Sequence, residues 1–593
     1  MAVGLVSVAP IYLNGLLALL CVFILPGLIF VRAFDIPNFP QRMLVIISSS
    51  LATNYFLVVL IATLHLNPLE TYRSVVLVLA TALASLTVMD FLGRKAAPWM
   101  RHDGAVVLKS DFRWLALSLA LVCLAYFNIW KRGVPNIFLE GDVSISWNTW
   151  ASIWAHGLFP TGSYGYPQLI PTLWAVSYIF TGSVEHYFAY YIYIVLIIVP
   201  LVLTSAYLGR TGWLPALLPL VTFVWFVAEI QDPWLRATLP AGFPDWTAAV
   251  CGFCGLVLFI NNDPGKLFDR EKITTALASL CLILLAAATK PIYGLFALAV
   301  LLRLCLDAAA LLSGRERRRF LAAAIGLFAA FAAAYLVMYW HLTVRSLPGD
   351  PVSDLGERLR RSVRLFNGNF TLPFRILACV GIALSPFLPR IRWLTLPLLL
   401  GTCLWAAAAS YDMRNLFGVL LIGAFIPLFA ASRKMDISPA ENAGSGWRVP
   451  DAAVAALLAV FAVGSTFTLA LDDTHLNARF NSEQFGIGAG ADFNTRVDQL
   501  LGRGCVLLTG ADYIYTISTF AKYLPQLEYF HASLPLPEPV TKKFDELHGC
   551  TGIMYPPALS LASVVEYVKA ESEQRQYVTA AESRGWVLLT SPP

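Results

Sequence analysis

The chain has 593 residues, of which 58% are hydrophobic and only 13% are charged. This composition lies far outside the soluble globular range and predicts a protein that crosses a membrane many times. Basic residues of cytoplasmic loops account for the formal net charge of +5, so the charge gives no reason to expect nucleic acid binding.

Apolar runs that are long enough to cross a bilayer recur along most of the chain. We expect spans at 10–32, 43–65, 73–93, 113–130, 187–208, 214–230, 247–262, 273–289, 291–312, 319–341, 374–388, 394–410, 414–431 and 451–471. Short loops that are rich in lysine and arginine, such as 94–109 and 315–319, should remain in the cytoplasm. Four spans then precede Asp142 and place it, with the amino terminus, on the outer side.

One further apolar run, 166–182, is expected not to cross the membrane. If it and 187–208 both crossed, the basic loop that follows would lie outside. The first run is the shorter of the two and contains two prolines. We therefore expect a re-entrant or surface-lying helix on the outer side, which is tolerated at membrane depth only when it packs against protein. The total becomes about fourteen crossings, with both termini outside.

The outer segment before this run combines acidic and aromatic residues. Glu140 and Asp142 are carboxylates in a hydrophobic protein, where charged groups are costly and often functional. Trp147 and Trp150 share a helix face, and Tyr166 follows them, so we expect a helix that lies along the bilayer surface. The alternative is that both acids are solvated loop residues and that Asp142 only caps the helix.

Other polar segments are expected on the same outer side. They are 231–246, which contains Asp232 and Asp245, the junction at Lys290, the arginine-rich loop 342–373, and the start of the span at Arg414. A cluster of outward arginines favours an anionic ligand. A solvated amphipathic helix with internal ion pairs would explain the loop equally well, and Lys290 could simply extend toward the interface.

From residue 472 onward the composition becomes that of a soluble domain. The segments 505–509, 527–531 and 552–555 are typical of β-strands, and helical patterns at 511–523 and 561–571 lie between or after them. This alternation predicts a small α/β domain outside the membrane. Cys505 and Cys550 each begin an expected strand; in an oxidising compartment they could form a disulfide, and the sequence leaves two free thiols equally open.

These outward groups suit one kind of chemistry when they are taken together. A carboxylate can accept the proton of an attacking hydroxyl or help to hold a divalent cation. Lysine and arginine can neutralise a phosphate that departs with the electrons of a broken bond. Interfacial aromatic rings can hold a sugar. The combination indicates transfer of a sugar from a lipid phosphate.

At this point the sequence resembles the GT-C superfamily, particularly the branch that contains the bacterial aminoarabinose transferases and the protein O-mannosyltransferases. The resemblance covers roughly 113–432. It rests on five features in order: Glu140-Gly141-Asp142, Tyr166-Pro167-Gln168-Leu169, Gly242-Phe243-Pro244-Asp245, Lys290, and Arg414-Asn415. Members of the branch have juxtamembrane helices, which is similar to our interpretation of 166–182. Val143 stands where a second acid usually follows Asp142, which leaves metal dependence open.

The resemblance implies an inverting glycosyltransferase at the periplasmic face of a bacterial inner membrane. It would move a sugar from a polyprenyl-phosphate donor to a glycan, lipid or protein acceptor, with Asp142 as catalytic base. Candidates for a second carboxylate or for a ligand of Mg²⁺ or Mn²⁺ are Asp245, Glu140 and Asp232. Donor-phosphate candidates are Lys290, Arg414, Arg345, Arg358, Arg360 and Arg361, and the candidate sugar or interface aromatics are Trp147, Trp150 and Tyr166.

The expected fold is an α-helical polytopic membrane protein with a small periplasmic α/β domain. We divide it into an amino-terminal transmembrane block (1–112), a GT-C-like catalytic module (113–432) with outer loops 131–186, 231–246 and 342–373, a cytoplasmic linker with the last span (433–471), and the carboxy-terminal domain (472–593). Two other functions fit parts of the pattern. One is an O-antigen ligase or polymerase that uses a diphosphate-linked donor, and the other is a lipid or sugar transporter.

Overall fold

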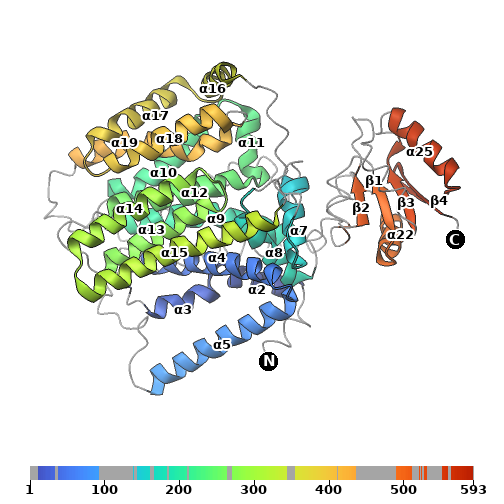
Figure 1. Ribbon diagram of the computed structural model, residues 1–593, viewed down its shortest axis with the longest axis horizontal. Helices are drawn as coiled ribbons and strands as arrows, with labels where there is room; N and C mark the ends of the chain where they lie inside the picture. The colour runs from blue at the N-terminus through green and yellow to red at the C-terminus, as the bar shows by residue number, and fades with distance from the viewer. Residues whose placement is uncertain are drawn as a thin grey trace.

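The computed structural model shows a helical bundle and a small sheet domain (Figure 1). It describes residues 11–33, 36, 38–92, 116, 138, 143–160, 166–182, 186–209, 213–262, 270–342, 354–409, 412–435, 489–509, 520, 523, 526–529, 550–557 and 562–591.

The bundle contains the following α-helices: α2 (Ile11–Phe23), α3 (Leu25–Ala33), α4 (Phe39–Thr63), α5 (Pro68–Leu92), α7 (Thr149–Ala155), α8 (Leu169–Thr181), α9 (His186–Leu208), α10 (Trp213–Ala228), α11 (Pro233–Ala241), α12 (Pro244–Asn261), α13 (Arg270–Ala287), α14 (Tyr293–Leu311), α15 (Gly314–His341), α16 (Leu355–Asn369), α17 (Leu372–Leu384), α18 (Thr395–Leu404) and α19 (Phe417–Met435). Short π-helices occupy η1 (Val143–Asn148) and η4 (Trp405–Ala409), and 3₁₀ turns occupy η2 (Ser385–Phe387), η3 (Arg392–Leu394) and η5 (Met413–Leu416).

Eight helices in the described part of the chain are long and apolar enough to cross a membrane. They are Leu13–Val31, Phe39–Thr63, His186–Leu208, Pro244–Asn261, Tyr293–Leu311, Gly314–His341, Arg392–Ala409 and Met413–Ser432. The chain is thus a polytopic helical membrane protein, and its described part contains eight of the fourteen expected spans at full length. The expected spans 113–130 and 451–471 lie outside the described residues, apart from residue 116, and α10 and α17 are shorter apolar helices.

Helix α8 corresponds to the run that we expect not to cross. It has 13 residues, and every side chain from Leu169 to Phe180 is buried. At 1.5 Å per residue it rises about 20 Å, less than the roughly 30 Å of a bilayer core. The helix packs against α2, α4, α7 and α9 and ends at Gly182, whose φ of 71° is in the left-handed region that glycine tolerates best. It is a short helix enclosed by protein.

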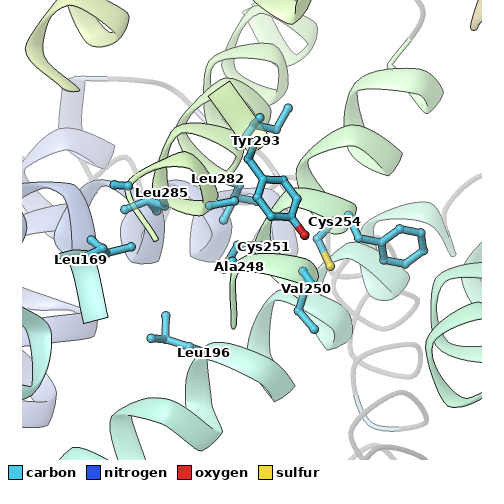
Figure 2. Packing of buried hydrophobic residues seen from close by; sticks show 14 of the residues in the cluster. Leu169, Leu196, Ala248, Val250, Cys251, Cys254, Leu282, Leu285 and Tyr293 are labelled. Carbon is cyan, nitrogen blue, oxygen red and sulfur yellow. The ribbon is translucent and has the colours of Figure 1, made fainter. Parts of the chain in front are cut away.

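Helix α12 forms the centre of the bundle and packs against α9, α13 and α19. Tyr293, at the start of α14, packs into this centre, and Figure 2 shows its ring beside α12 residues that include Cys251 and Cys254. Glycines make room for the ring, because a Cβ atom added at Gly252 of α12 or at Gly418 of α19 would overlap it. Close packing of this kind fixes where α14 begins.

The sheet domain has the strand order β2-β1-β3-β5-β4. Its strands are β1 (Val506–Thr509), β2 (Leu527–Tyr529), β3 (Thr551–Tyr555), β4 (Val578–Ser583) and β5 (Trp586–Thr590), and its helices are α22 (Ala491–Gly502) and α25 (Ala562–Gln574). Strands β1, β2 and β3 are parallel, while β5 runs antiparallel to β3 and β4. The three predicted strands coincide with β1, β2 and β3, and the helical pattern 561–571 with α25. Most of the other expected helix, 511–523, lies outside the described residues.

Two features of this domain extend the prediction. The sequence analysis did not identify the hairpin of β4 and β5, whose two strands are joined through Arg584 and Gly585 at positive φ. A disulfide joins Cys505 and Cys550, 45 residues apart, directly before the neighbouring strands β1 and β3. Of the two alternatives that the sequence left open, the structure has the bonded one.

Candidate functional site

The turn between α11 and α12 positions a buried carboxylate. Gly242 ends α11 with a φ of 96°, and Pro244 starts α12, where its missing N–H costs nothing. Asp245 therefore lies in the first turn of α12. A Cβ atom at Gly242 would come within 2.9 Å of the Phe138 ring, so glycine is needed here for both conformation and space. The four residues from Gly242 to Asp245 act as one structural unit.

Asp245 is the centre of a buried cluster of charged residues. Its Oδ1 lies 2.7 Å from Lys290 Nζ, and its Oδ2 lies 3.7 Å from Arg414 Nη1. Arg414 is also paired with Asp412, whose Oδ2 lies 2.6 Å from Nη2. Lys290 donates to Asn415 Oδ1 at 3.3 Å. The Asp245 side chain is 2% exposed and the Lys290 side chain 9% exposed, so this network is shielded from water.

Aromatic rings surround the Lys290 ammonium. Its Nζ lies 5.5 Å from the centre of the Tyr166 ring and 6.0 Å from that of Trp147, within the range of cation–π attraction. Trp150 stacks against Tyr166, with 6.0 Å between ring centres, and completes the group. Of the two tryptophans expected at the membrane surface, Trp147 thus faces the charged cluster and Trp150 packs against Tyr166, and both are buried.

A cavity of about 350 Å³ opens beside the cluster. Its walls come from four segments that are distant in the sequence, and they carry Arg414, Asp412, Asp232, Tyr166, Trp234, Leu235, Leu365, Asn369 and Met413. The Arg414 guanidinium lies over the Trp234 ring at 5.2 Å. Asp232 caps α11 by accepting a hydrogen bond from the Trp234 N–H at 2.9 Å. A cationic group, two carboxylates and aromatic surface therefore meet in one space.

A second buried network fixes the chain on both sides of residues 139–142. The backbone N–H of Phe138 donates to His186 Nδ1 at 3.2 Å, and His186 Nε2 lies 3.0 Å from Asn148 Nδ2. The Tyr178 hydroxyl donates to Asn148 Oδ1. Val143 is fully buried and begins the π-helix η1, a form that is frequent at functional sites.

The structure brings together several of the predicted site residues and separates others. Those at the cluster or on the cavity wall are Asp245, Lys290, Arg414, Asp232, Tyr166, Trp147 and Trp150. Arg358 instead donates to the backbone carbonyl of Ala407 at 3.2 Å, and Arg360 is exposed on α16. Glu140, Asp142 and Arg345 lie outside the described residues.

Sequence analysis gave no role to Asp412 or Trp234, and it named Asn415 only as the residue that follows Arg414. Asp412 stands two residues before Arg414, a spacing at which its carboxylate accepts from both the backbone N–H and the side chain of that arginine. Trp234 follows the Asp-Pro step that opens α11, and this local pattern gives no sign of a cavity. Within the described residues no group of three His, Cys, Asp or Glu side chains could hold a metal ion, and the expectation of a divalent cation stays untested because it involves Glu140.

No protein-family model matches the chain, and no curated protein matches its sequence. Among solved structures, the chain is similar to ArnT from Cupriavidus metallidurans in two crystal structures. The structure bound to undecaprenyl phosphate has 13% sequence identity and a TM-score of 0.44, with 80% of this chain and 97% of that chain covered. The apo structure has 13% identity and a TM-score of 0.45, with 81% and 98% covered.

Proposed function

We propose that the protein is a glycosyltransferase that moves a sugar from a polyprenyl-phosphate donor to a cell-envelope glycan, lipid or protein. The observation that carries this proposal is the buried Asp245–Lys290–Arg414–Asp412 cluster beside a cavity with aromatic walls. The cluster lies at the ends of membrane helices, where a lipid head group and a soluble sugar can meet.

The balance of charges in the cluster suits a phosphate ligand. Two cationic side chains, Lys290 and Arg414, face two carboxylates, so the described cluster is neutral when empty. A sugar phosphodiester brings one negative charge, and the lipid phosphate that leaves carries a second at neutral pH. Lys290 and Arg414 are the groups that can neutralise this charge as it develops, which is the form of catalysis that lowers barriers most. Asp245 holds the two cations in place.

The reaction that we propose is a single displacement. The acceptor hydroxyl oxygen attacks the anomeric carbon, the bond from that carbon to the phosphate oxygen breaks, and the electron pair leaves with the lipid phosphate. Asp142 accepts the hydroxyl proton as general base, and the configuration at the anomeric carbon inverts. The position of Val143, the residue that follows Asp142, supports this role. Val143 lies beside Gly242, because a Cβ atom added at Gly242 would be 3.7 Å from Val143 Cγ1.

Other predicted residues take supporting roles in this proposal. The rings of Trp147, Trp150 and Tyr166 would hold the sugar or the head group. Glu140 and Asp232 would serve as further carboxylates, with a divalent cation if the enzyme uses one. The active site would face the periplasm of a bacterial inner membrane.

Transfer assays with purified full-length protein in proteoliposomes test this proposal. A labelled polyprenyl-phosphate sugar and an envelope extract are supplied, and transfer is compared for wild type, Asp142→Asn, Lys290→Met and the surface control Arg318→Gln. We expect Asp142→Asn to lose about 10²–10⁴-fold in rate, as removal of a general base does. Lys290→Met should lose about 10²–10³-fold.

Parallel reactions with a diphosphate-linked donor separate the alternatives. Transfer from that donor alone would favour an O-antigen ligase or polymerase. Turnover of Asp142→Asn equal to that of wild type, in a protein that unfolds like wild type, would remove Asp142 as the base.

A further inference from the structure

Helix α16 closes one side of the cavity. Asp354 caps it, with Oδ1 accepting from the Gly356 N–H at 3.1 Å. Leu365 and Asn369 of this helix line the cavity. On the same side, Arg358 Nη1 donates to the Ala407 carbonyl in η4. One face of α16 is therefore fixed against the site.

A second face of α16 is apolar and exposed. Leu355, Leu359 and Val363 follow one another at intervals of four residues, a spacing that puts them on one stripe of the helix. They are 56%, 45% and 60% exposed. Figure 1 shows α16 at the edge of the bundle, where such a stripe can meet lipid.

A third face of α16 carries positive charge. Arg360 and Arg364 are exposed, and neither has an ion pair or a side-chain hydrogen bond among the described residues. At 100° per residue, Arg360 lies about 140° around the helix axis from Leu365, which lines the cavity. Arg364 lies at the same angle from Asn369, the other cavity-lining residue of α16. Over its whole length the helix has four arginines and one glutamate.

We propose that α16 is an interfacial helix that docks on the bilayer surface and binds anionic phospholipid head groups through Arg360 and Arg364. The leucine and valine stripe then enters the acyl boundary, and the arginines extend to the head-group phosphates. Anionic lipid attracts each such arginine measurably at physiological salt. Sequence analysis named Arg360 as a donor-phosphate candidate, but its position away from the cavity favours a phosphate at the membrane surface.

Through this docking, the lipid composition of the membrane affects how firmly the cavity wall formed by α16 is held. The lipid-binding and cavity-lining residues belong to one rigid helix of 15 residues, so lipid that holds one face also holds the other. The inference does not depend on which reaction the cavity carries out.

Hydrogen exchange of the full chain in nanodiscs tests the proposal without an activity assay. Exchange of the backbone amides of 355–369 is compared in phosphatidylcholine alone and with added phosphatidylglycerol. We expect the anionic lipid to slow exchange by up to about thirtyfold, about fivefold for each of two arginines. In the variant Arg360→Gln/Arg364→Gln, the anionic lipid should slow exchange by less than about twofold.

The matched control is Arg317→Gln/Arg318→Gln, which removes the same charge from the exposed start of α15 and should keep the full effect in α16. Equal exchange of wild-type α16 in the two lipids would overturn the proposal, even if the variants fail to fold. Slowing by inorganic phosphate in phosphatidylcholine nanodiscs would also overturn it, since this would show a site for free anions. Retention of the lipid effect by Arg360→Gln/Arg364→Gln would exclude the two arginines.

Discussion

Removing the charge of Lys290 should destabilise the bundle, and removing the charge of Asp245 as well should restore much of the loss. Lys290→Met leaves Asp245 buried with Arg414 at 3.7 Å as its remaining cation in the described cluster. Asp245→Asn leaves the ammonium with Asn415 at 3.3 Å and two aromatic rings. The double variant has neither charge.

The geometry sets the size of the effect. At 2.7 Å and an effective dielectric constant of about 20, the attraction between Lys290 and Asp245 is about 6 kcal/mol, before the cost of removing both ions from water. Breaking a buried pair by removing one partner typically costs about 3–5 kcal/mol, because the other charge stays buried. Replacing both partners by neutral groups is often close to neutral. We therefore expect a coupling energy of about 3 kcal/mol between the two substitutions.

A double-mutant cycle measures this coupling. The free energy of unfolding is obtained for wild type, both single variants and the double variant, by denaturing the detergent-solubilised protein with SDS and following tryptophan fluorescence. Single losses below about 1 kcal/mol that simply add would match an exposed ion pair and would refute the buried geometry. A large coupling energy combined with unimpaired sugar transfer by Lys290→Met would support the buried ion pair. It would also show that Lys290 does not bind the donor.

Two further predictions concern packing and cross-linking. Gly418→Ala should lower the free energy of unfolding by about 1–3 kcal/mol, because the new methyl group overlaps Tyr293. Gly294→Ala, in the same region with nothing within 4 Å, should be neutral or stabilising, and equal losses for both variants in the SDS titration would contradict the packing. Breaking the Cys505–Cys550 disulfide should destabilise the sheet domain by about 4 kcal/mol, since it closes a 45-residue separation. Faster hydrogen exchange across β1 and β3 in reducing buffer would show this loss, whereas unchanged exchange would argue against it.

Local sequence was sufficient for some parts of the site. Gly242 to Asp245 could be identified because a left-handed glycine and a helix-starting proline fix the backbone over four residues. Lys290 was identifiable as a cation at the junction of two apolar runs, although the sequence alone also allowed a lysine that extends toward the interface. Strands β1 and β3 were predicted because buried parallel strands have short, uniformly apolar sequences.

Other parts depend on contacts that a sequence does not display. Asp412 resembles an ordinary turn residue until the chain places Arg414 next to Asp245, 169 positions earlier in the sequence, at 3.7 Å. The strand β4 was missed because its side chains are exposed or half-buried, so it lacks the apolar pattern of a core strand. The arginines of α16 were pooled as one group, although helix geometry directs Arg358 and Arg360 to different faces.

The sharing of a cation within the cluster is the feature that connects structure to function most directly. A purely structural ion pair needs no cavity beside it. Here two cations and two carboxylates stand beside a cavity, and Arg414 is already shared between Asp245 and Asp412. A phosphate that enters can take over one of these contacts without leaving a cation bare. When it leaves, the carboxylate takes the contact back. Such exchange keeps both cations paired at every stage, as binding and release of an anionic lipid phosphate would require.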